Sequence, residues 1–213
     1  MKINKSFHYP FVLLGDRNYV QASNQTYGLI EALKSWSIGK VDRIIGNFHH
    51  IIQNQCRYDD FDNNKEKNLI QHGYSTIFHI IWNKAQFAVG LKPLSEKVVT
   101  SVVYDETQLI SGYELDKKRR LVALEVDKNQ LINKIIALNK QMHTQLFSQQ
   151  GYSNWFCSKL ELNWQALHSI VPFRIEIRLL REMRSLYTKS QIGLNQNTVG
   201  YIYFSRRPAH DRN

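Results

Sequence analysis

The sequence has few of the residues that build disulfide, metal and cofactor sites. Its 2 cysteines, Cys56 and Cys157, have no CxxC spacing, so neither a disulfide framework nor a zinc site is indicated. The 10 glycines form no GxGxxG run and no phosphate-binding loop, which argues against dinucleotide redox chemistry and nucleotide hydrolysis. No GxSxG run supplies a serine nucleophile. We therefore expect neither a metal nor a cofactor.

Long apolar runs are also absent. No segment approaches the ~20 uninterrupted apolar residues that span a bilayer, and the first residues lack a small-residue cleavage site. We expect a cytoplasmic protein that does not enter a membrane, and the scarcity of cysteine fits a reducing compartment. With 213 residues, 43% of them hydrophobic, the chain can form one core or two small halves packed together.

The charge is strongly one-sided, with a formal net charge of +10. A field of that sign attracts polyanions and acidic surfaces, so nucleic acid, the phosphates of coenzyme A and an acidic acyl carrier protein are all possible partners. Much of the excess lies late in the chain, in residues 117–120 and beyond residue 173. Charge runs are most often solvated surfaces, and the run alone does not choose among these partners.

A strand–helix–strands pattern occurs twice, in residues 12–33 and again in residues 122–142 with the segments that follow each. In the first half, residues 7–14 form an opening strand, with Pro10 confining that portion to a sheet edge or a strand start. Ser23 or Asn24 caps the following helix, which Gly39 ends. In the second half, Asp127 caps a helix of about twenty residues with an apolar face. This organisation predicts an α+β fold with two repeats, residues 1–107 and 108–213.

Segments rich in β-branched and aromatic residues follow each helix. We expect strands within residues 44–56, 74–91, 97–106 and 154–164, a hairpin over 109–126, and a three-stranded antiparallel meander over 173–204. Residues 173–179 alternate strictly between apolar and charged side chains, so one face of that strand is solvated. Residues 59–68 are predicted to be an exposed loop. Its aspartates lack the Gly and Glu that a calcium loop requires.

The duplicated pattern resembles the hot-dog fold, in which an antiparallel sheet wraps around one long helix. The stretches KLELNWQAL (159–167) and VPFRIEIRLLREMRSLYTKSQIGLNQNTVGYIYFSRR (171–207) are similar to the closing strands of that superfamily. Two units in one chain would resemble a double hot-dog, a fused pseudo-dimer. The resemblance implies a protein that binds or processes acyl thioesters of coenzyme A or acyl carrier protein. Such a dehydratase or thioesterase would act in fatty-acid, polyketide or other secondary metabolism.

The resemblance also implies where the site lies, because members of the superfamily place an acidic residue, Asn, Gln or His at or just before the start of the central helix. The positions of this chain that fall there are His8, Asp16, Asn24 and Glu31 in the first half and Glu125, Asp127 and Asn129 in the second. No dehydratase signature of His followed by Pro and Gly is present, which leaves a binding-only member open. Asp16, Asn24, Glu31 and His49 are the predicted catalytic residues. Arg119, Arg120 and Arg206 are predicted to meet coenzyme phosphates.

The histidines and the basic sheet leave alternatives open. If His49 and His79 share a face they can form a site, whereas His72, His143, His168 and His210 are expected at the surface or in loops. The second functional hypothesis is nucleic-acid binding by a sheet that carries arginines and tyrosines. Its candidate residues are Arg174, Arg178, Arg181, Arg184, Tyr187, Tyr201 and Tyr203. The sequence leaves open whether the chain forms a homodimer.

Overall fold

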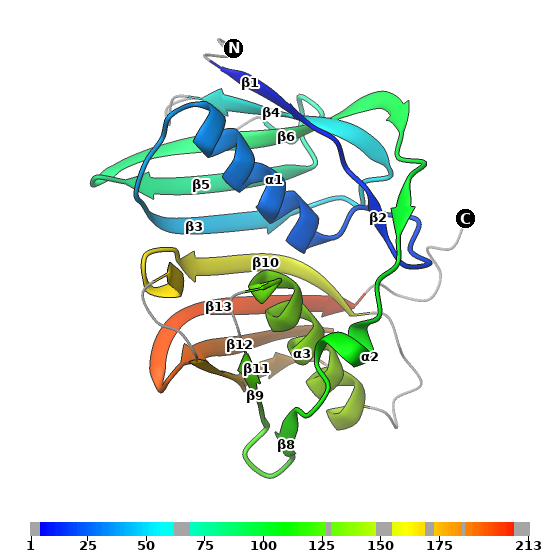
Figure 1. Cartoon of the computed structure of the whole chain (residues 1–213), viewed down its shortest axis with the longest axis vertical. Helices are drawn as coiled ribbons and strands as arrows, with labels where there is room; N and C mark the ends of the chain where they lie inside the picture. Colours follow the sequence, from blue (N-terminus) through cyan, green and yellow to red (C-terminus); the bar gives the residue numbers. More distant parts are fainter. Residues whose placement is uncertain are drawn as a thin grey trace. The chain divides into compact units, whose positions relative to one another are not determined.

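The computed structural model describes residues 5–61, 69–126, 129–147, 155–168, 173–184 and 186–206. The chain divides into two compact units, Met1–Asp105 and Glu106–Asn213, and each is described by itself. Each unit contains antiparallel strands and one principal helix, so the predicted α+β class is confirmed (Figure 1). No helix in the described part of the chain is long and apolar enough to cross a membrane.

The first unit is an antiparallel sheet with one helix on it. Its strand order is β1-β4-β6-β5-β3. The strands are β1 (Ser6–Tyr9), β3 (Val41–Phe48), β4 (Asn54–Phe61), β5 (Thr76–Trp82) and β6 (Ala85–Lys97), and the helix is α1 (Ala22–Ser35). A separate parallel pair joins β2 (Leu13–Leu14) to β7 (Ser101–Val102).

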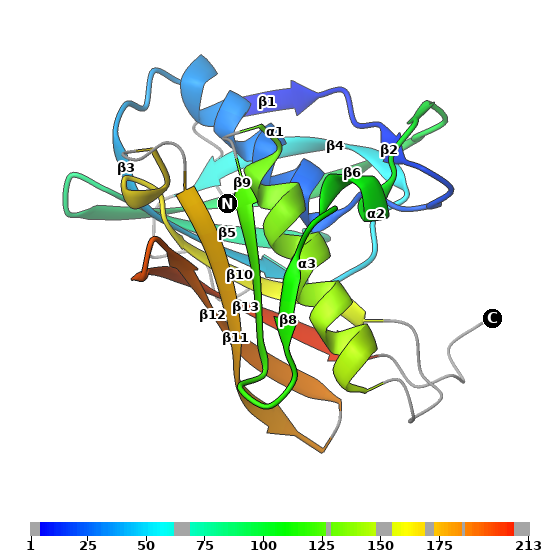
Figure 2. The same cartoon turned by 60° about the horizontal axis from the view of Figure 1, so that its bottom comes forward.

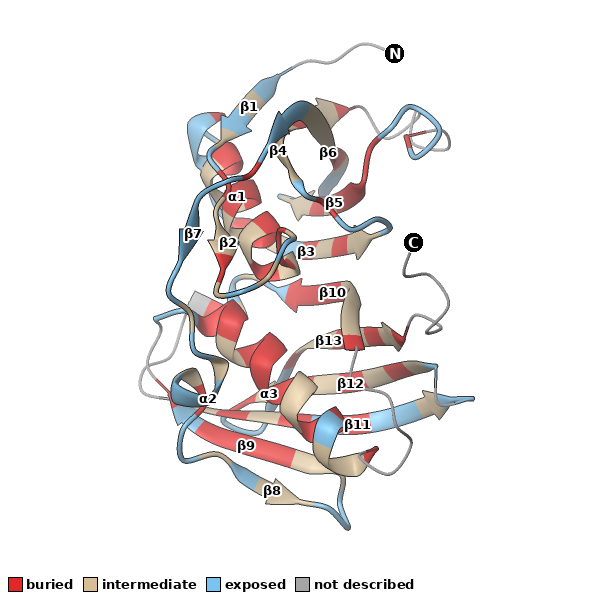
Figure 3. Ribbon diagram, turned by 90° about the vertical axis from the view of Figure 1, so that its right-hand side faces the viewer, coloured by how far each residue is buried: buried red, intermediate tan, exposed pale blue. Residues whose placement is uncertain are grey.

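Helix α1 packs closely on the sheet because it presents a glycine there. A Cβ at Gly28 would collide with the hydroxyl of Tyr58 and lie 3.0 Å from the ring of Tyr9. Leu29 and Leu33 continue the buried stripe (Figure 3). The missing side chain therefore allows the helix backbone to approach the aromatic residues of β1 and β4.

Both ends of α1 differ from the prediction. The helix starts at Ala22, and Gln21 at the N-cap makes no side-chain capping bond, so Ser23 and Asn24 are not caps. At the other end, Ser37 adopts φ 58°. The Ile38 amide donates to the carbonyl of Leu33, which completes a Schellman arrangement before the chain reaches Gly39.

Two strand predictions in the first unit were also wrong. The expected strand over residues 7–14 is divided at Pro10, because proline donates no ladder hydrogen bond, so β1 ends at Tyr9 and β2 begins at Leu13. The expected loop begins too early, because Asp59 and Asp60 lie in β4, paired with β6. Residues 62–68 of that loop lie outside the described residues. Residues 97–106 form only the end of β6 and the short β7 before α2 begins at Glu106.

The second unit has a larger antiparallel sheet of order β10-β13-β12-β11-β9-β8. Its strands are β8 (Glu114–Asp116), β9 (Leu121–Val126), β10 (Trp155–Asn163), β11 (Phe173–Met183), β12 (Tyr187–Leu194) and β13 (Asn197–Arg206), and its helices are α2 (Glu106–Leu109) and α3 (Leu131–Leu146). A short 3-10 turn spans Ala166–His168. The β8–β9 hairpin and the β11–β12–β13 meander are confirmed.

The alternation in β11 is confirmed as well. Ile175, Ile177 and Leu179 are buried, whereas Arg178 is exposed. The turn between β12 and β13 is made by Asn195 and Gln196, both at positive φ, as a two-residue hairpin of this twist requires.

Helix α3 covers the inner face of this sheet and is shorter than predicted. It begins after Gln130, which adopts a left-handed φ of 55°. The predicted cap Asp127 lies outside the described residues. One expectation on α3 was wrong: His143 is 0% exposed. It lies on the apolar stripe with Ile135 and Met142, four residues after the equally buried Asn139. The side chain of His168 and all of His210 are outside the described part.

Candidate active site

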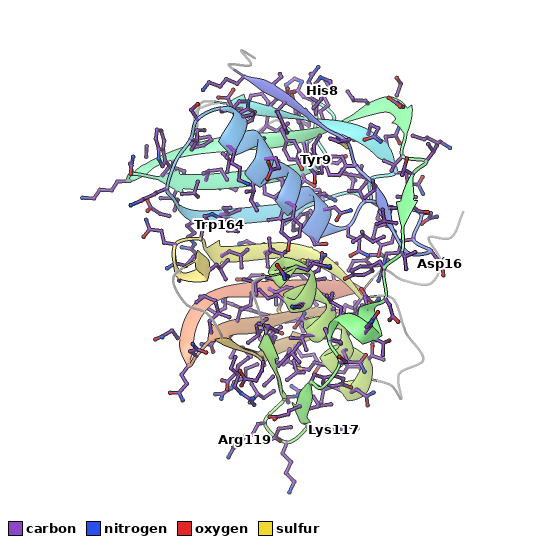
Figure 4. All side chains as sticks on the ribbon, viewed as in Figure 1. His8, Tyr9, Asp16, Lys117, Arg119 and Trp164 are labelled. Carbon is purple, nitrogen blue, oxygen red and sulfur yellow. The ribbon has the colours of Figure 1, made fainter. Side chains whose placement is uncertain are left out.

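Two predicted catalytic residues stand near the start of α1. Asp16 follows β2 in an exposed turn (Figure 4). Asn24 lies in the first turn of the helix, where its Nδ2 donates to the carbonyl of Val12 over 2.8 Å. Asn24 therefore ties the helix to the incoming chain.

The other two predicted catalytic residues lie apart from these. Glu31 is two helical turns beyond Asn24, 46% exposed, and forms an ion pair of 2.7 Å with Lys34. His49 is exposed immediately after β3, and burial of part of its ring, with repulsion from His50 and His79, lowers its pKa. No hydrogen bond or ion pair in the described part of the chain joins any two of the four predicted residues.

His79 does not complete an inward-facing histidine site with His49. On β5 it is paired with Ile45 and alternates with Phe78, whose ring is fully buried on the side of α1. Because successive side chains of a strand point to opposite faces, His79 lies on the outward face of the first sheet. The interior of the first unit therefore contains neither of these histidines.

The three arginines predicted to meet coenzyme phosphates are divided between the surface and the core. Arg119 is 77% exposed in the β8–β9 turn (Figure 4). Arg120 forms an ion pair of 3.0 Å with Glu182. Arg206 is only 8% exposed, and both Arg120 and Arg206 place their guanidinium carbons 5.9 Å from the ring centroid of Phe147. The structure thus brings two of the three together around Phe147.

A row of buried polar side chains lies under α3. His143 Nδ1 is 2.6 Å from the carbonyl oxygen of Asn139, and His143 Nε2 is 2.7 Å from Thr188 Oγ1. Only an N–H can satisfy a carbonyl, so Nδ1 carries the proton and donates to Asn139. Nε2 then accepts from the hydroxyl of Thr188. This is a hydroxyl, an imidazole base and an orienting carbonyl in series, the arrangement that activates nucleophiles in acyl transfer.

The row continues with Asn139 and Ser190. Helix α3 returns alongside β9 (Figure 2), and β12 runs in the direction of β9 because both are antiparallel to β11. Helix and β12 are therefore antiparallel, and the contact between His143 and Thr188 sets their alignment. The step from His143 back to Asn139 is one helical turn, ~5 Å along α3. The step from Thr188 forward to Ser190 is two residues, ~7 Å along β12. Because the two elements are antiparallel, both steps run in the same direction. Asn139 and Ser190 therefore lie on the same side of the contact between His143 and Thr188.

These two side chains have unused hydrogen-bonding capacity. Asn139 and Ser190 are both 0% exposed. Neither the amide of Asn139 nor the hydroxyl of Ser190 has a hydrogen-bond partner within the described ranges, and the same holds for the indole nitrogen of Trp155. A buried polar group without a partner costs ~1–3 kcal/mol. Such groups in one row point to a ligand that would satisfy them.

The electrostatics keep His143 in the form that accepts protons. Burial lowers its pKa to about 4, and the nearby Arg206 and Arg120 lower it further, against the opposing effects of the Asn139 carbonyl and Glu182. The rings of Trp155, Phe204 and Phe147 surround it at centroid distances of 4.7, 5.3 and 5.7 Å. His143 is therefore a neutral base at pH 7.

The corresponding place in the first unit is closed. There Thr76 Oγ1 donates to Gln25 Oε1 over 2.6 Å, Gln25 Nε2 donates to the Val20 carbonyl, and Tyr58 donates to the Gln25 carbonyl. Only the hydroxyl of Ser23 lacks a partner in the part that the structure describes. The two units thus differ in chemistry: apart from Ser23, the polar groups named here in the first unit satisfy one another, whereas Asn139, Ser190 and Trp155 of the second have no partner among the described residues.

The sequence did not lead to this row, although it contained a signal. Asn139 and His143 interrupt the apolar stripe of α3 at a spacing of four, which places both on one buried helix face. Thr188 and Ser190 alternate with apolar residues in β12 but suit an exposed face equally well. No group of three or more His, Cys, Asp or Glu side chains that could hold a metal occurs among the described residues.

The fold is similar to that of solved structures. No family model and no curated protein sequence matches the chain. A solved tesB protein from Mycobacterium avium subsp. paratuberculosis has a TM-score of 0.57 at 8% identity, covering 95% of this chain and 93% of that one. A protein designated thioesterase II from Thermobifida fusca has a TM-score of 0.52 at 8% identity, covering 95% and 92%. The chain therefore resembles the hot-dog superfamily in its fold, as its sequence pattern predicted.

Proposed function

We propose that the chain is an acyl-thioester hydrolase that acts on acyl groups carried by coenzyme A or acyl carrier protein. The observation that carries the proposal is the row under α3, in which a neutral imidazole accepts from a threonine hydroxyl beside unpartnered amide and hydroxyl groups. The fold supports it, because one of the two structures described above, that from Thermobifida fusca, is designated thioesterase II.

Each member of the row has a role in this chemistry. The thioester carbonyl carbon is attacked by Thr188 Oγ1 as its proton passes to His143 Nε2, and the C–S bond breaks as the proton passes on to the leaving thiol. Water then cleaves the threonine ester with the same base. Asn139 Nδ2 and Ser190 Oγ donate to the oxyanion that develops on the carbonyl oxygen.

The row is closed to solvent in this structure, so the substrate must enter by separating α3 from β12. We infer that two exposed segments, the β8–β9 turn with Arg119 and the β11–β12 hairpin, flank the C-terminal end of α3, where His143 lies. Arg119, with Arg120 and Arg206 once released from their present contacts, would hold phosphates of coenzyme A or acidic groups of a carrier protein.

We propose that the two predicted repeats, residues 1–107 and 108–213, are each a hot-dog unit with a central helix and that they have different roles. The second repeat carries the reaction, since its buried polar groups are unpartnered. The first repeat has a satisfied interior and acts as the structural half of the pair.

The test is hydrolysis of a panel of acyl-coenzyme A and acyl-carrier-protein thioesters by the full chain, followed by release of the free thiol. Thr188→Val removes the hydroxyl and should lower kcat at least ~100-fold, whereas Thr188→Ser should retain measurable turnover. Thr76→Val in the first unit is the matched control, because it removes an equally buried strand hydroxyl bonded to a helix side chain. It should leave kcat unchanged at equal folded fraction.

Two further variants separate a functional role from a structural one. Asn139→Leu and Ser190→Ala remove unpartnered polar atoms and should raise the free energy of unfolding by ~1–3 kcal/mol each. Both should nevertheless lower thioester turnover. Variants that are more stable and equally active would show that the row has no role in the reaction.

Variants of the four catalytic residues predicted from the sequence are measured in the same hydrolysis assay. Asp16→Asn, Asn24→Ala, Glu31→Gln and His49→Ala test a site at the start of α1. Substrates with a 3-hydroxyl group, scored by mass for loss of water, test the dehydratase reaction. A chain that binds thioesters without turning any over would be the binding-only member of the fold.

A further inference from the structure

The outward face of the second sheet has its own organisation. Two rows of side chains cross the strands there, as the register shows. One row runs from Arg181 on β11 through Lys189 on β12 to Tyr203 on β13. The next runs from Arg178 through Gln191 to Tyr201. Cations, an amide and aromatic rings thus lie side by side on adjacent strands.

The cations of these rows repel one another. Arg181 and Lys189 are directly opposite across the β11–β12 ladder, and like charges in that position destabilise a sheet. Arg178 lies on the same face of β11, beyond the bulge between Leu179 and Arg181. Within the described ranges none of the three forms an ion pair. The sheet therefore concentrates three positive charges, and the carboxylate of Glu176 on the same face of β11 forms an ion pair with Arg174.

A neighbouring lysine shows the contrast. Lys159 on β10 forms an ion pair of 2.8 Å with Glu161, and Tyr203 donates to the same carboxylate over 3.0 Å. Lys189 has only aromatic rings beside it, with Nζ 4.2 Å from the centroid of Tyr201 and 5.5 Å from that of Tyr203. The tyrosine face thus holds the lysine in place next to the arginines.

A groove of about 260 Å³ adjoins the rows. Two glutamine amides, one carboxylate and one guanidinium contribute to its lining. The lining residues are Leu121, Glu176, Arg178, Gln191, Gly193, Gln196 and Thr198. Pockets that enclose drug-sized ligands measure ~300–1,000 Å³, so this groove has room for one small polar group rather than for a long acyl chain.

We propose that this outward face binds a nucleotide. Its phosphate lies among Arg178, Arg181 and Lys189, its base stacks on Tyr201, and the amides of Gln191 and Gln196 meet polar edges in the groove. Arginine and lysine bind phosphate strongly, and a tyrosine face stacks any base. The same chemistry is offered by a free nucleotide, such as the adenosine bisphosphate end of coenzyme A, and by a strand of nucleic acid.

This face is distinct from the candidate active site. Side chains of β12 alternate, so Thr188 and Ser190 point toward α3 whereas Lys189 and Gln191 point outward. The nucleotide site therefore does not depend on thioester hydrolysis, and each can fail without the other.

The experiment measures binding to the full chain of adenosine 3′,5′-bisphosphate, a single-stranded ten-residue RNA and inorganic phosphate, at low and high salt. Arg181→Gln with Lys189→Gln should weaken nucleotide binding at least ~10-fold and reduce the salt dependence for the RNA by ~0.7 per lost contact. Lys117→Gln with Lys118→Gln removes the same charge from the exposed β8–β9 turn and should change affinity less than twofold. Both double variants should hydrolyse a short acyl thioester like the unchanged chain.

Variants of Tyr201 test whether a base stacks on this face. Tyr201→Leu should weaken binding ~5-fold or more, and Tyr201→Phe should not, because only the ring stacks. Equal affinity for the bisphosphate and the RNA supports a free nucleotide, and much tighter RNA binding supports a nucleic-acid strand. Binding of none of the probes overturns the proposal. So does binding that responds to the arginine–lysine variant but not to Tyr201→Leu, since the face then holds only an anion.

Discussion

The hydroxyl of Thr188 donates to Nε2 of His143 across 2.7 Å, and both side chains are almost completely buried. A strand hydroxyl and a helix imidazole therefore fix the position of α3 on the second sheet. Burial, helped by the nearby Arg206 and Arg120, lowers the pKa of the imidazole and keeps it neutral, with its Nδ1–H donated to the Asn139 carbonyl. Protonation of Nε2 would reverse the direction of this bond, because the imidazolium N–H would donate to the hydroxyl oxygen of Thr188.

The first prediction is that acid destabilises the protein through His143. Its folded pKa of about 4 is below the usual 6.5, so between these values the unfolded chain binds the proton and the folded chain does not. Stability is therefore unaffected above pH 7, falls as pH drops through 6.5, and levels off below 4. The expected loss at pH 5 is ~2 kcal/mol, measured by urea unfolding at pH 7.5 and 5.0.

His143→Gln is the control for this prediction, because glutamine has no titrating group. The difference in unfolding free energy between the two pH values should shrink by about the same ~2 kcal/mol in the variant. An unchanged difference would mean that other groups cause the acid sensitivity.

The second prediction concerns the buried carboxylate of Asp59 in the first unit. It is 0% exposed and accepts from Arg57 at 2.8 and 3.1 Å, from Ser6 at 2.6 Å and from Tyr74 at 2.8 Å. Asp59→Asn leaves the guanidinium without its counter-charge and should cost ~3 kcal/mol of stability. Tyr74→Phe removes one bond and should cost ~1.5 kcal/mol. Chemical unfolding of both variants checks the order, and a smaller loss for Asp59→Asn would contradict it.

The third prediction is that a methyl group at Gly28 weakens α1 packing. Alanine favours a helix over glycine by ~1 kcal/mol, but here its Cβ meets the Tyr58 hydroxyl, which is anchored 2.6 Å from the Gln25 carbonyl. Gly28→Ala should therefore be destabilising by ~1–3 kcal/mol. Gly39→Ala is the matched control, since nothing lies within 4 Å of its added Cβ. Thermal unfolding should show a lower midpoint for Gly28→Ala alone.

The fourth prediction is that both thiols are unreactive in the folded protein. Burial raises the pKa of Cys56 to about 12 and also raises that of Cys157, although the Lys159 carbonyl contact lowers the latter in part. Only the thiolate reacts with a disulfide reagent, so labelling of Cys56 at pH 8 should be on the order of a thousandfold slower than for a free cysteine. Rapid labelling of either thiol before denaturation would contradict this.

The elements that local sequence predicted well are those whose hydrophobic pattern is long. The strict alternation of residues 173–179 and the apolar stripe of residues 131–146 each repeat over several turns or pleats, and both elements form as expected. Boundaries were less predictable. Ser37 supplies the left-handed residue that was assigned to Gly39, because a polar side chain tolerates that conformation when the surrounding bonds are made.

The candidate site depended on contacts that no local pattern contains. Asp59 looked like a loop residue until β4 and Tyr74 enclosed it. His143 and Thr188 are 45 residues apart. No sequence pattern around either residue indicates that the two form a hydrogen bond.

The sequence by itself determined the α+β class, the amphipathic helices and the alternating strands, because these depend on residue periodicity within a short segment. Only the tertiary structure decided which polar side chains are buried and which remain without a partner. It also decided that Arg181 and Lys189 meet across a ladder. The first depends on contacts between segments far apart in the chain, and the second on the register of the β11–β12 hairpin with its bulge. Both follow from the packing of the whole unit.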